Sequence, residues 1–221
     1  MCGIAGIYGS TAFGVLDKMI TVMHHRGPDD SGVWYDAQAD VGLANVRLAI
    51  QDLSPAGRMP MTDGARWITY NGEVYNFLKL RQELEAHGHI FRTGSDTEVI
   101  LAAYRQWGTD CLSHFRGMFA FAIYDPEAGG QLFLARDHFG IKPLYWTYID
   151  NTYVFASELK ALIASGLVAK KADHQAIWDY FSIGSVIPPR TIFDGVHALL
   201  PGHAMLIKDR QEHIWQWWDL Y

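Results

Sequence analysis

The sequence predicts an α+β fold in which antiparallel β-sheets are covered by helices. The chain has 221 residues, of which 49% are hydrophobic and 19% charged, a composition typical of a folded domain with a large core. Apolar, β-prone stretches bounded by turn residues recur often enough for two sheets, and helical patterns lie before and between them. This order favours layered sheets covered by helices, although it does not determine the order of the strands.

Nine segments are predicted as strands because they are apolar, β-prone and bounded by Gly, Asp, Asn or Pro. They are Gly3–Tyr8, Val41–Ile50, Trp67–Tyr70, Phe119–Tyr124, Leu132–Ala135, Leu144–Ile149, Tyr153–Ala156, Ala204–Ile207 and Ile214–Trp218. Five segments have apolar residues at helical spacing or are short helix candidates. They are Val15–Met23, Leu78–His87, Val99–Trp107, Glu158–Ala164 and Ala176–Phe181.

The start of the third helix is marked most clearly. Ser95 is followed three residues later by Glu98, which is the form of a capping box, so Asp96 is expected in the first helical turn. Repeats and low-complexity linkers are not evident, so we expect one domain over residues 1–221. The apolar end around Trp215 and Trp217 predicts contact with a partner surface or a following domain.

Charge and hydropathy exclude several kinds of partner. Eighteen Lys and Arg against 24 Asp and Glu give a formal net charge of -6. No basic cluster is dense enough to follow a phosphate backbone, so we expect no nucleic acid partner. Apolar runs stay short of the roughly 20 residues that cross a bilayer, and a signal-peptide pattern is missing, so no membrane association and a cytoplasmic location are expected. Cys2 and Cys111 are predicted to be free thiols.

Cys2 is the strongest candidate for chemistry. Removal of Met1 would leave an N-terminal cysteine, which combines a thiol of reference pKa about 8.5 with an α-amine of about 7.7 to 8.0. These two groups can exchange a proton near neutral pH, so one residue can supply both nucleophile and base. On position alone, an equally good interpretation is that Cys2 is a small apolar residue that opens a strand.

Five further motifs occur in a fixed order along the chain. They are His24–Asp29, Arg47–Ile50, Asn71–Asn76, Gly94–Asp96 and Arg136–Leu144. Together with the Cys2-Gly3-Ile4 start, they resemble class II glutamine amidotransferase domains, which use an N-terminal nucleophile. The segments Asn71–Asn76, Gly117–Ala122, Arg136–Leu144 and Ala156–Leu162 are most similar to the glutamine-hydrolysing asparagine synthetases.

The resemblance implies a four-layer αββα sandwich of two antiparallel sheets and a glutaminase that forms a thioester on Cys2. It implies that Asn71 and Gly72 donate hydrogen bonds to the oxyanion. An alternative from the residues alone is that Asn71-Gly72 forms a type I′ hairpin turn after a strand, and a turn could also present donors.

The same resemblance implies how L-glutamine would be recognised. Arg47 would bind the α-carboxylate, Glu73 and Asp96 would bind the α-ammonium, and Leu48 and Ile50 would line the pocket through their backbones. Taken singly, the charged residues could equally form surface ion pairs, or, for Asp96, favour a helix N-terminus. Arg26 would act indirectly, by ordering the loop near the Cys2 amine.

Asparagine synthetases continue into an ATP-pyrophosphatase domain with a Ser-Gly-Gly-x-Asp-Ser loop, and this motif is missing from the 221 residues. The resemblance therefore implies that this domain supplies ammonia to a C-terminal synthetase domain, where ATP and Mg would bind. In this domain we expect no cofactor and no metal, because the ten histidines lack zinc-ligand spacing. A homodimer is possible. Two alternatives stay open: an inert domain kept for packing or allosteric contact, or a parent enzyme that amidates an acceptor other than aspartate.

Overall fold

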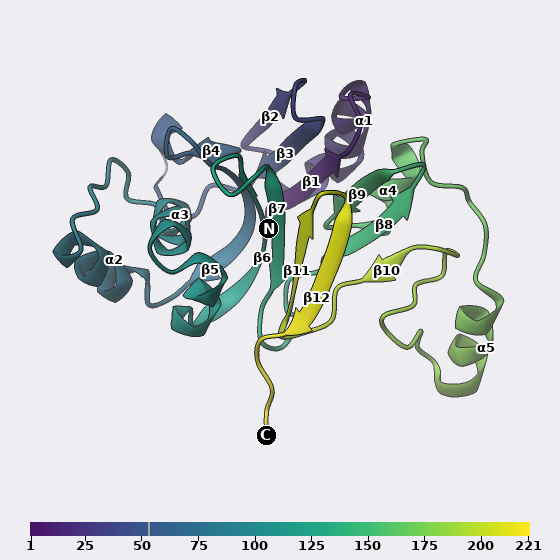
Figure 1. The fold of residues 1–221 in the computed structure, drawn as a ribbon. Helices are drawn as coiled ribbons and strands as arrows, with labels where there is room; N and C mark the ends of the chain where they lie inside the picture. The colour runs from purple at the N-terminus through teal and green to yellow at the C-terminus, as the bar shows by residue number, and fades with distance from the viewer. Residues whose placement is uncertain (53) are drawn as a thin grey trace.

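Side chains that alternate along the strands build four layers. A computed structural model describes residues 1–52 and 54–221, and these form two antiparallel six-stranded sheets with helices on their outer faces (Figure 1). Along β6 (Gly117–Asp125), Phe119 and Phe121 pack with the helices, whereas Ala120 and Ala122 pack against the opposite sheet. The central strand β6 is therefore buried on both faces, and the predicted αββα sandwich is confirmed.

The first sheet has the order β10-β8-β9-β1-β3-β2. Its strands are β1 (Gly3–Tyr8), β2 (Asp30–Asp36), β3 (Val41–Arg47), β8 (Tyr145–Ile149), β9 (Thr152–Ala156) and β10 (His197–Ala198). Helices α1 (Gly14–Met23) and α4 (Leu159–Ala164) cover its outer face through an apolar cluster that includes Leu16 and Leu162. Because β1 is central, the residue that precedes it lies at the middle of one end of the sheet.

The second sheet has the order β12-β11-β7-β6-β5-β4. Its strands are β4 (Met61–Thr62), β5 (Trp67–Val74), β6, β7 (Gln131–Arg136), β11 (His203–Lys208) and β12 (Gln211–Gln216). Helices α2 (Phe77–Ala86) and α3 (Asp96–Trp107) cover its outer face, where Leu84 and Ile100 are buried. The remaining helix, α5 (His174–Ile183), lies to one side of both sheets in Figure 1.

Two strands differ from their predicted extents near the site, and one strand was not predicted. The strand predicted at Trp67–Tyr70 continues to Val74 and pairs with β6 along its whole length, so the hairpin turn considered at Asn71-Gly72 was wrong. The strand predicted at Val41–Ile50 ends at Arg47. The edge strand β2 was missed because it begins with the turn-like residues Asp-Ser-Gly and is only partly buried.

The α3 cap is a variant of the predicted capping box. The Ser95 hydroxyl accepts a hydrogen bond from the Thr97 N–H, as an N-cap should. The Glu98 carboxylate does not return to Ser95 and instead accepts from the N–H groups of Arg92 and Thr93. Asp96 is the first residue of the helix, as predicted.

The described residues contain neither a membrane-spanning helix nor a cluster of metal-ligating side chains. In residues 1–52 and 54–221, every helix is too short or too polar to cross a membrane. Across these ranges, His, Cys, Asp and Glu side chains also form no group of three that could hold a metal ion. Cys2 and Cys111 are both free thiols.

Candidate active site

The candidate residues converge where the ends of β1, β3 and β5 meet the start of α3. Cys2 precedes β1, Arg47 ends β3, Gly72 and Glu73 lie in β5, and Asp96 begins α3. One small cavity is lined by most of the residues singled out in the sequence: Cys2, Arg47, Leu48, Ile50, Gly72, Glu73 and Asp96. The two others, Asn71 and Arg26, lie next to lining residues.

The Cys2 thiol is half-buried and touches the backbone of the β3 exit loop. Its Sγ lies 3.4 Å from the Leu48 nitrogen, whose N–H points at the sulfur, and 3.6 Å from the Leu48 carbonyl oxygen. Burial raises the pKa of the thiol, against the lowering effects of the Leu48 N–H, the ammonium of Met1 and Arg47. A thiol in this environment needs a base to become a nucleophile.

Arg26 fixes the backbone at Cys2. Its Nε donates a hydrogen bond of 2.8 Å to the Cys2 carbonyl oxygen, and its Nη1 pairs with Glu158 at 2.9 Å. The side chain of Arg26 is only 9% exposed. Arg26 therefore contacts the backbone of the residue near which the sequence places it, and its ordering role stays a prediction.

Asn71 and Gly72 lie inside β5, opposite Ala120 and Phe119 of β6. The buried Asn45 side chain in β3 donates to the Tyr70 carbonyl at 3.1 Å and so connects β5 to the first sheet. A Cβ at Gly72 would lie 2.3 Å from the Met118 carbonyl oxygen, so only glycine fits there. The strand is therefore held against the neighbouring backbone at this point.

The Asn71 side chain is buried but its amide nitrogen is unsatisfied. Asn71 is 1% exposed, and its Nδ2 is without a hydrogen-bond partner in the described part of the chain. Buried donors are nearly always paired, so an unpaired one requires a reason. Three further polar atoms in the same neighbourhood are buried without a hydrogen-bond partner in the described residues, namely Nη2 of Arg26, Oδ1 of Asn45 and Oε1 of Gln51.

Arg47 is buried without a carboxylate partner in the described residues. It is 7% exposed and donates to the backbone carbonyl oxygens of Ser54, Gln51 and Asp52. Neutral carbonyls satisfy its N–H groups but do not neutralise its charge. The guanidinium can therefore form a charge-assisted, two-point contact with a carboxylate that enters the cavity.

Two carboxylates face the other side of the cavity. Asp96 is 4% exposed, and its Oδ2 accepts hydrogen bonds from the Tyr70 hydroxyl at 2.8 Å and the Val74 N–H at 2.9 Å. Burial raises the pKa of Asp96, although these two donors lower it. Burial and then the charge of Asp96 raise the pKa of Glu73. Two carboxylates with raised pKa values form a site that a cation would stabilise.

The cavity is nearly filled by the loop that follows β3. Gln51 donates a hydrogen bond from its side-chain amide to Glu73, and its backbone carbonyl accepts one from Arg47. The remaining open volume is about 30 Å³, room for about one water molecule. The cavity is therefore too small for a ligand of amino-acid size as it stands, and the Gln51 side chain lies on one of the two carboxylates that face it.

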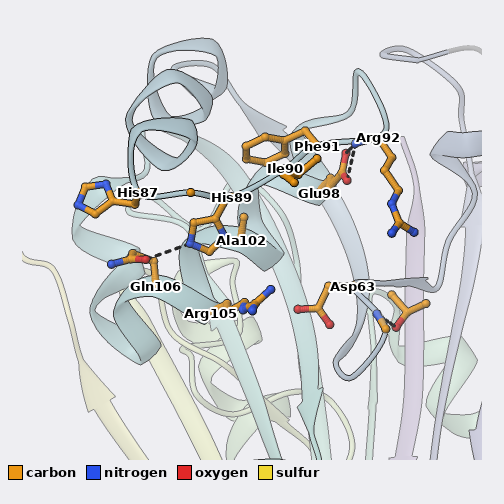
Figure 2. A pocket seen from close by; sticks show the side chains of 13 residues that line it. Asp63, His87, His89, Ile90, Phe91, Arg92, Glu98, Ala102, Arg105 and Gln106 are labelled. Carbon is orange, nitrogen blue, oxygen red and sulfur yellow. Dashed lines mark hydrogen bonds between the residues drawn. The ribbon is translucent and has the colours of Figure 1, made fainter.

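A larger pocket of about 590 Å³ lies between α3, the segment before it and the β4–β5 turn, as Figure 2 shows. It shares no lining residue with the Cys2 cavity. In this pocket the Glu98 carboxylate accepts hydrogen bonds from the N–H groups of Arg92 and Thr93. His89 forms a hydrogen bond of 3.0 Å with Gln106. Neither of the two cysteines lines this pocket, so size alone does not identify the site.

Sequence reasoning missed three residues at the site. The Tyr70 hydroxyl donates a hydrogen bond to Asp96, and the Gln51 side-chain amide donates one to Glu73. Lys142 is buried with its Nζ 3.2 Å from the Met1 sulfur. Lys142 belongs to a motif that the sequence did single out, and its signal was a lysine within an otherwise apolar Ile141–Leu144 segment. For Tyr70 and Gln51 the sequence carries no such signal, because an aromatic residue in a strand and a polar residue in a loop are ordinary.

Comparisons with known proteins cover the whole chain. The family described as "Glutamine amidotransferase domain" matches residues 1–218. Asparagine synthetase (glutamine-hydrolyzing) 3 of Bacillus subtilis is 38% identical over 100% of this chain and 37% of its own length. Amidase chry2 of Gibberella zeae is 36% identical over 93% of this chain and 30% of its own. The chain thus spans about a third of the length of these curated relatives.

A solved structure supports the fold. Glutamine phosphoribosylpyrophosphate amidotransferase from B. subtilis, in complex with ADP and GMP, superimposes with a TM-score of 0.73 at 21% identity. The match covers 98% of this chain and 49% of that one. At this identity, the likeness establishes the shared arrangement of two sheets and their covering helices.

Proposed function

Because the chain belongs to the glutamine amidotransferase domain family, we propose that it hydrolyses L-glutamine to glutamate and ammonia through a thioester on Cys2. The observation that carries this proposal is the buried amide of Asn71, which has no hydrogen-bond partner in the described residues and lies next to Gly72, a lining residue of the cavity that Cys2 also lines. A buried donor without a partner, next to a nucleophile, is suited to an oxyanion that exists only during the reaction.

The first half of the reaction uses the α-amine of Cys2, which removal of Met1 exposes. The amine takes the thiol proton, and the thiolate attacks the side-chain carbonyl carbon of glutamine. A C–S bond forms, and the carbonyl electron pair becomes an oxyanion that the Asn71 amide and the Gly72 N–H stabilise. When the oxyanion collapses, the C–N bond breaks, the ammonium of Cys2 returns its proton to the departing nitrogen, and ammonia leaves.

The second half hydrolyses the thioester. The α-amine takes a proton from water, the resulting hydroxide attacks the thioester carbonyl, and the C–S bond breaks as the proton returns to sulfur. Arg47 holds the α-carboxylate of the substrate throughout, and Glu73 and Asp96 hold its α-ammonium. Leu48 and Ile50 flank the substrate at the rim, where Ile50 is 60% exposed.

The ammonia is proposed to serve a second domain. Since the curated relatives are about three times longer than this chain, we infer that a C-terminal ATP-pyrophosphatase domain binds ATP and Mg and uses the ammonia in the cytoplasm. This domain itself would need no cofactor or metal. Aspartate is the acceptor suggested by the name of the B. subtilis relative, and the amidase relative keeps another acceptor open. A homodimer of the parent fits this proposal equally.

The proposal is tested by intact-mass spectrometry before and after treatment with 6-diazo-5-oxo-norleucine, together with a glutamate-release assay. We expect loss of one methionine, a single adduct on Cys2 and hydrolysis of glutamine that the adduct abolishes. A chain that loses Met1 but takes no label and releases no glutamate would contradict the proposal and favour an inert domain.

Asp96→Asn should mainly weaken glutamine binding. The amide oxygen still accepts from Tyr70 and Val74, but the charge that receives the α-ammonium is lost, so KM should rise about 10- to 100-fold with little change in kcat. The free energy of unfolding should change by less than about 1 kcal/mol, because the hydrogen bonds remain. Since the pKa values of Asp96 and Glu73 are both raised, KM of the unaltered chain should also rise on acidification. An unchanged KM in the variant would refute the assignment.

A further inference from the structure

Lys142 is a buried lysine that lacks a carboxylate partner in the part of the chain that the structure describes. It is 3% exposed, and none of the recorded ion pairs includes it. Its Nζ lies 3.2 Å from the sulfur of Met1. Lysine is almost never fully buried unless it is paired, so this position requires an explanation.

The Arg136–Leu144 motif holds the Lys142 backbone rigidly. The buried Asp137 carboxylate accepts hydrogen bonds from the N–H groups of Lys142 at 2.9 Å and of Ile141 at 3.0 Å. Arg136 donates to the Lys142 carbonyl oxygen at 2.8 Å and to that of Gly140 at 2.7 Å. The charged side chains of Arg136 and Asp137 thus both hold the backbone of this loop. The mechanism proposed above gives the motif no other role.

The ammonium of Lys142 faces the start of the chain. The charged and titratable groups around it are Cys2 from the N-terminus, Arg26 from the segment after α1, Glu73 from β5 and Asp137 from its own loop. Burial and then Arg26 lower the pKa of Lys142, whereas Cys2, Glu73 and Asp137 raise it. Asp137 is already occupied by backbone N–H groups, and Arg26 binds the Cys2 carbonyl. Two cations therefore flank the nucleophilic residue.

We propose that Lys142 is a positioning residue for the N-terminal nucleophile, whose buried charge keeps the α-amine of Cys2 in its neutral, proton-accepting form. This inference rests on the function proposed above. The Lys142 Nζ lies against the side chain of Met1 and within electrostatic range of Cys2, so the amine that removal of Met1 exposes would lie near this buried positive charge. Such a charge disfavours a second positive charge on the amine and favours the thiolate.

Lys142→Met tests the proposal through the pH profile of kcat/KM for glutamine. Loss of the charge should move the acid limb of the profile upward by about one pH unit, because the amine then holds its proton to higher pH. Below the limb this corresponds to about a tenfold loss of activity, and above it the rates should converge. Lys142→Arg, which keeps the charge, should retain the original limb.

A second measurement does not depend on glutamine. The rate at which iodoacetamide alkylates Cys2, followed by intact mass against pH, reports the thiolate directly, and its midpoint should rise in Lys142→Met and in Lys142→Gln. The matched control is Lys171→Met, which removes the same charge from an exposed lysine paired with Asp194. This control should keep both profiles.

The outcomes separate the two proposals. If the pH profiles of Lys142→Met and of the unaltered chain coincide, the role of Lys142 is overturned. Equal losses of activity at every pH in the Met and Arg variants would also overturn it, because a purely structural role produces that result. A chain that releases no glutamate but shows a Lys142-dependent alkylation midpoint would overturn the proposed glutaminase and leave the effect of Lys142 on Cys2 standing.

Discussion

Cys2→Ala should reduce glutamine hydrolysis to background, a loss of about 10⁴-fold or more, since this variant removes the nucleophile. The thiol is half-buried, and its polar contacts are the two to Leu48, so the fold should lose no more than about 1 kcal/mol. Rates of glutamate release and thermal unfolding of the two chains provide the comparison. Retention of more than a few per cent of activity would remove Cys2 from this role.

The second cysteine supplies the matched control. Cys111 is fully buried in the core against α3, and burial raises the pKa of its thiol far above the usual range. Cys111→Ala should therefore keep the adduct on Cys2 and the hydrolysis rate, at some cost in thermal stability from the small cavity. Label on Cys111 in the Cys2→Ala chain would contradict this assignment.

Asn71→Ala should lower kcat about 10²- to 10³-fold and leave KM nearly unchanged. The lost donor acts on the oxyanion and not on the bound substrate, so the loss appears in the transition state. Steady-state kinetics with glutamine measure both constants. The Asn71 amide nitrogen is unpaired in the described residues. Its removal therefore leaves no acceptor without a hydrogen bond, and the free energy of unfolding should change little.

Asn71→Asp sharpens this test. It keeps the shape of the side chain but replaces the donor by a charge that repels the oxyanion, so kcat should fall at least as far as in Asn71→Ala. A kcat within about threefold of the unaltered chain in either variant would show that the Gly72 N–H alone suffices, contrary to the proposal.

Much of the fold was predictable because its strands are unusually apolar. β6 and β7 bury both faces, so continuous apolar runs mark them, and α3 carries its own cap. The polar edge strand β2 and the two-residue β4 carry no such pattern. The extent of β5 was underestimated because Asn-Gly is a strong local turn signal, which pairing with β6 overrides.

Site residues that belong to a family motif could be predicted from the sequence. Residues whose role depends on a tertiary contact could not. Cys2, Arg47 and Asp96 were chosen by motif, and they line one cavity. The task of Tyr70 depends on the packing of β5 against α3, and that of Lys142 on a loop folded around Asp137. The role of Tyr70 follows from its hydrogen bond to Asp96, and that of Lys142 from its burial without a carboxylate partner in the described residues. Neither can be read from local sequence.

The Gln51 side chain competes with any free ligand for the Glu73 carboxylate. Because Gln51 is part of the same chain, its effective concentration at Glu73 is fixed by the loop that carries it. It does not depend on the concentration of any ligand in solution. Under the proposed function, free glutamine would bind only the fraction of molecules in which Gln51 has left Glu73, and its apparent Kd would be the intrinsic value divided by that fraction. Any change that holds the Gln51 side chain away from Glu73 would then tighten glutamine binding without adding a contact to glutamine.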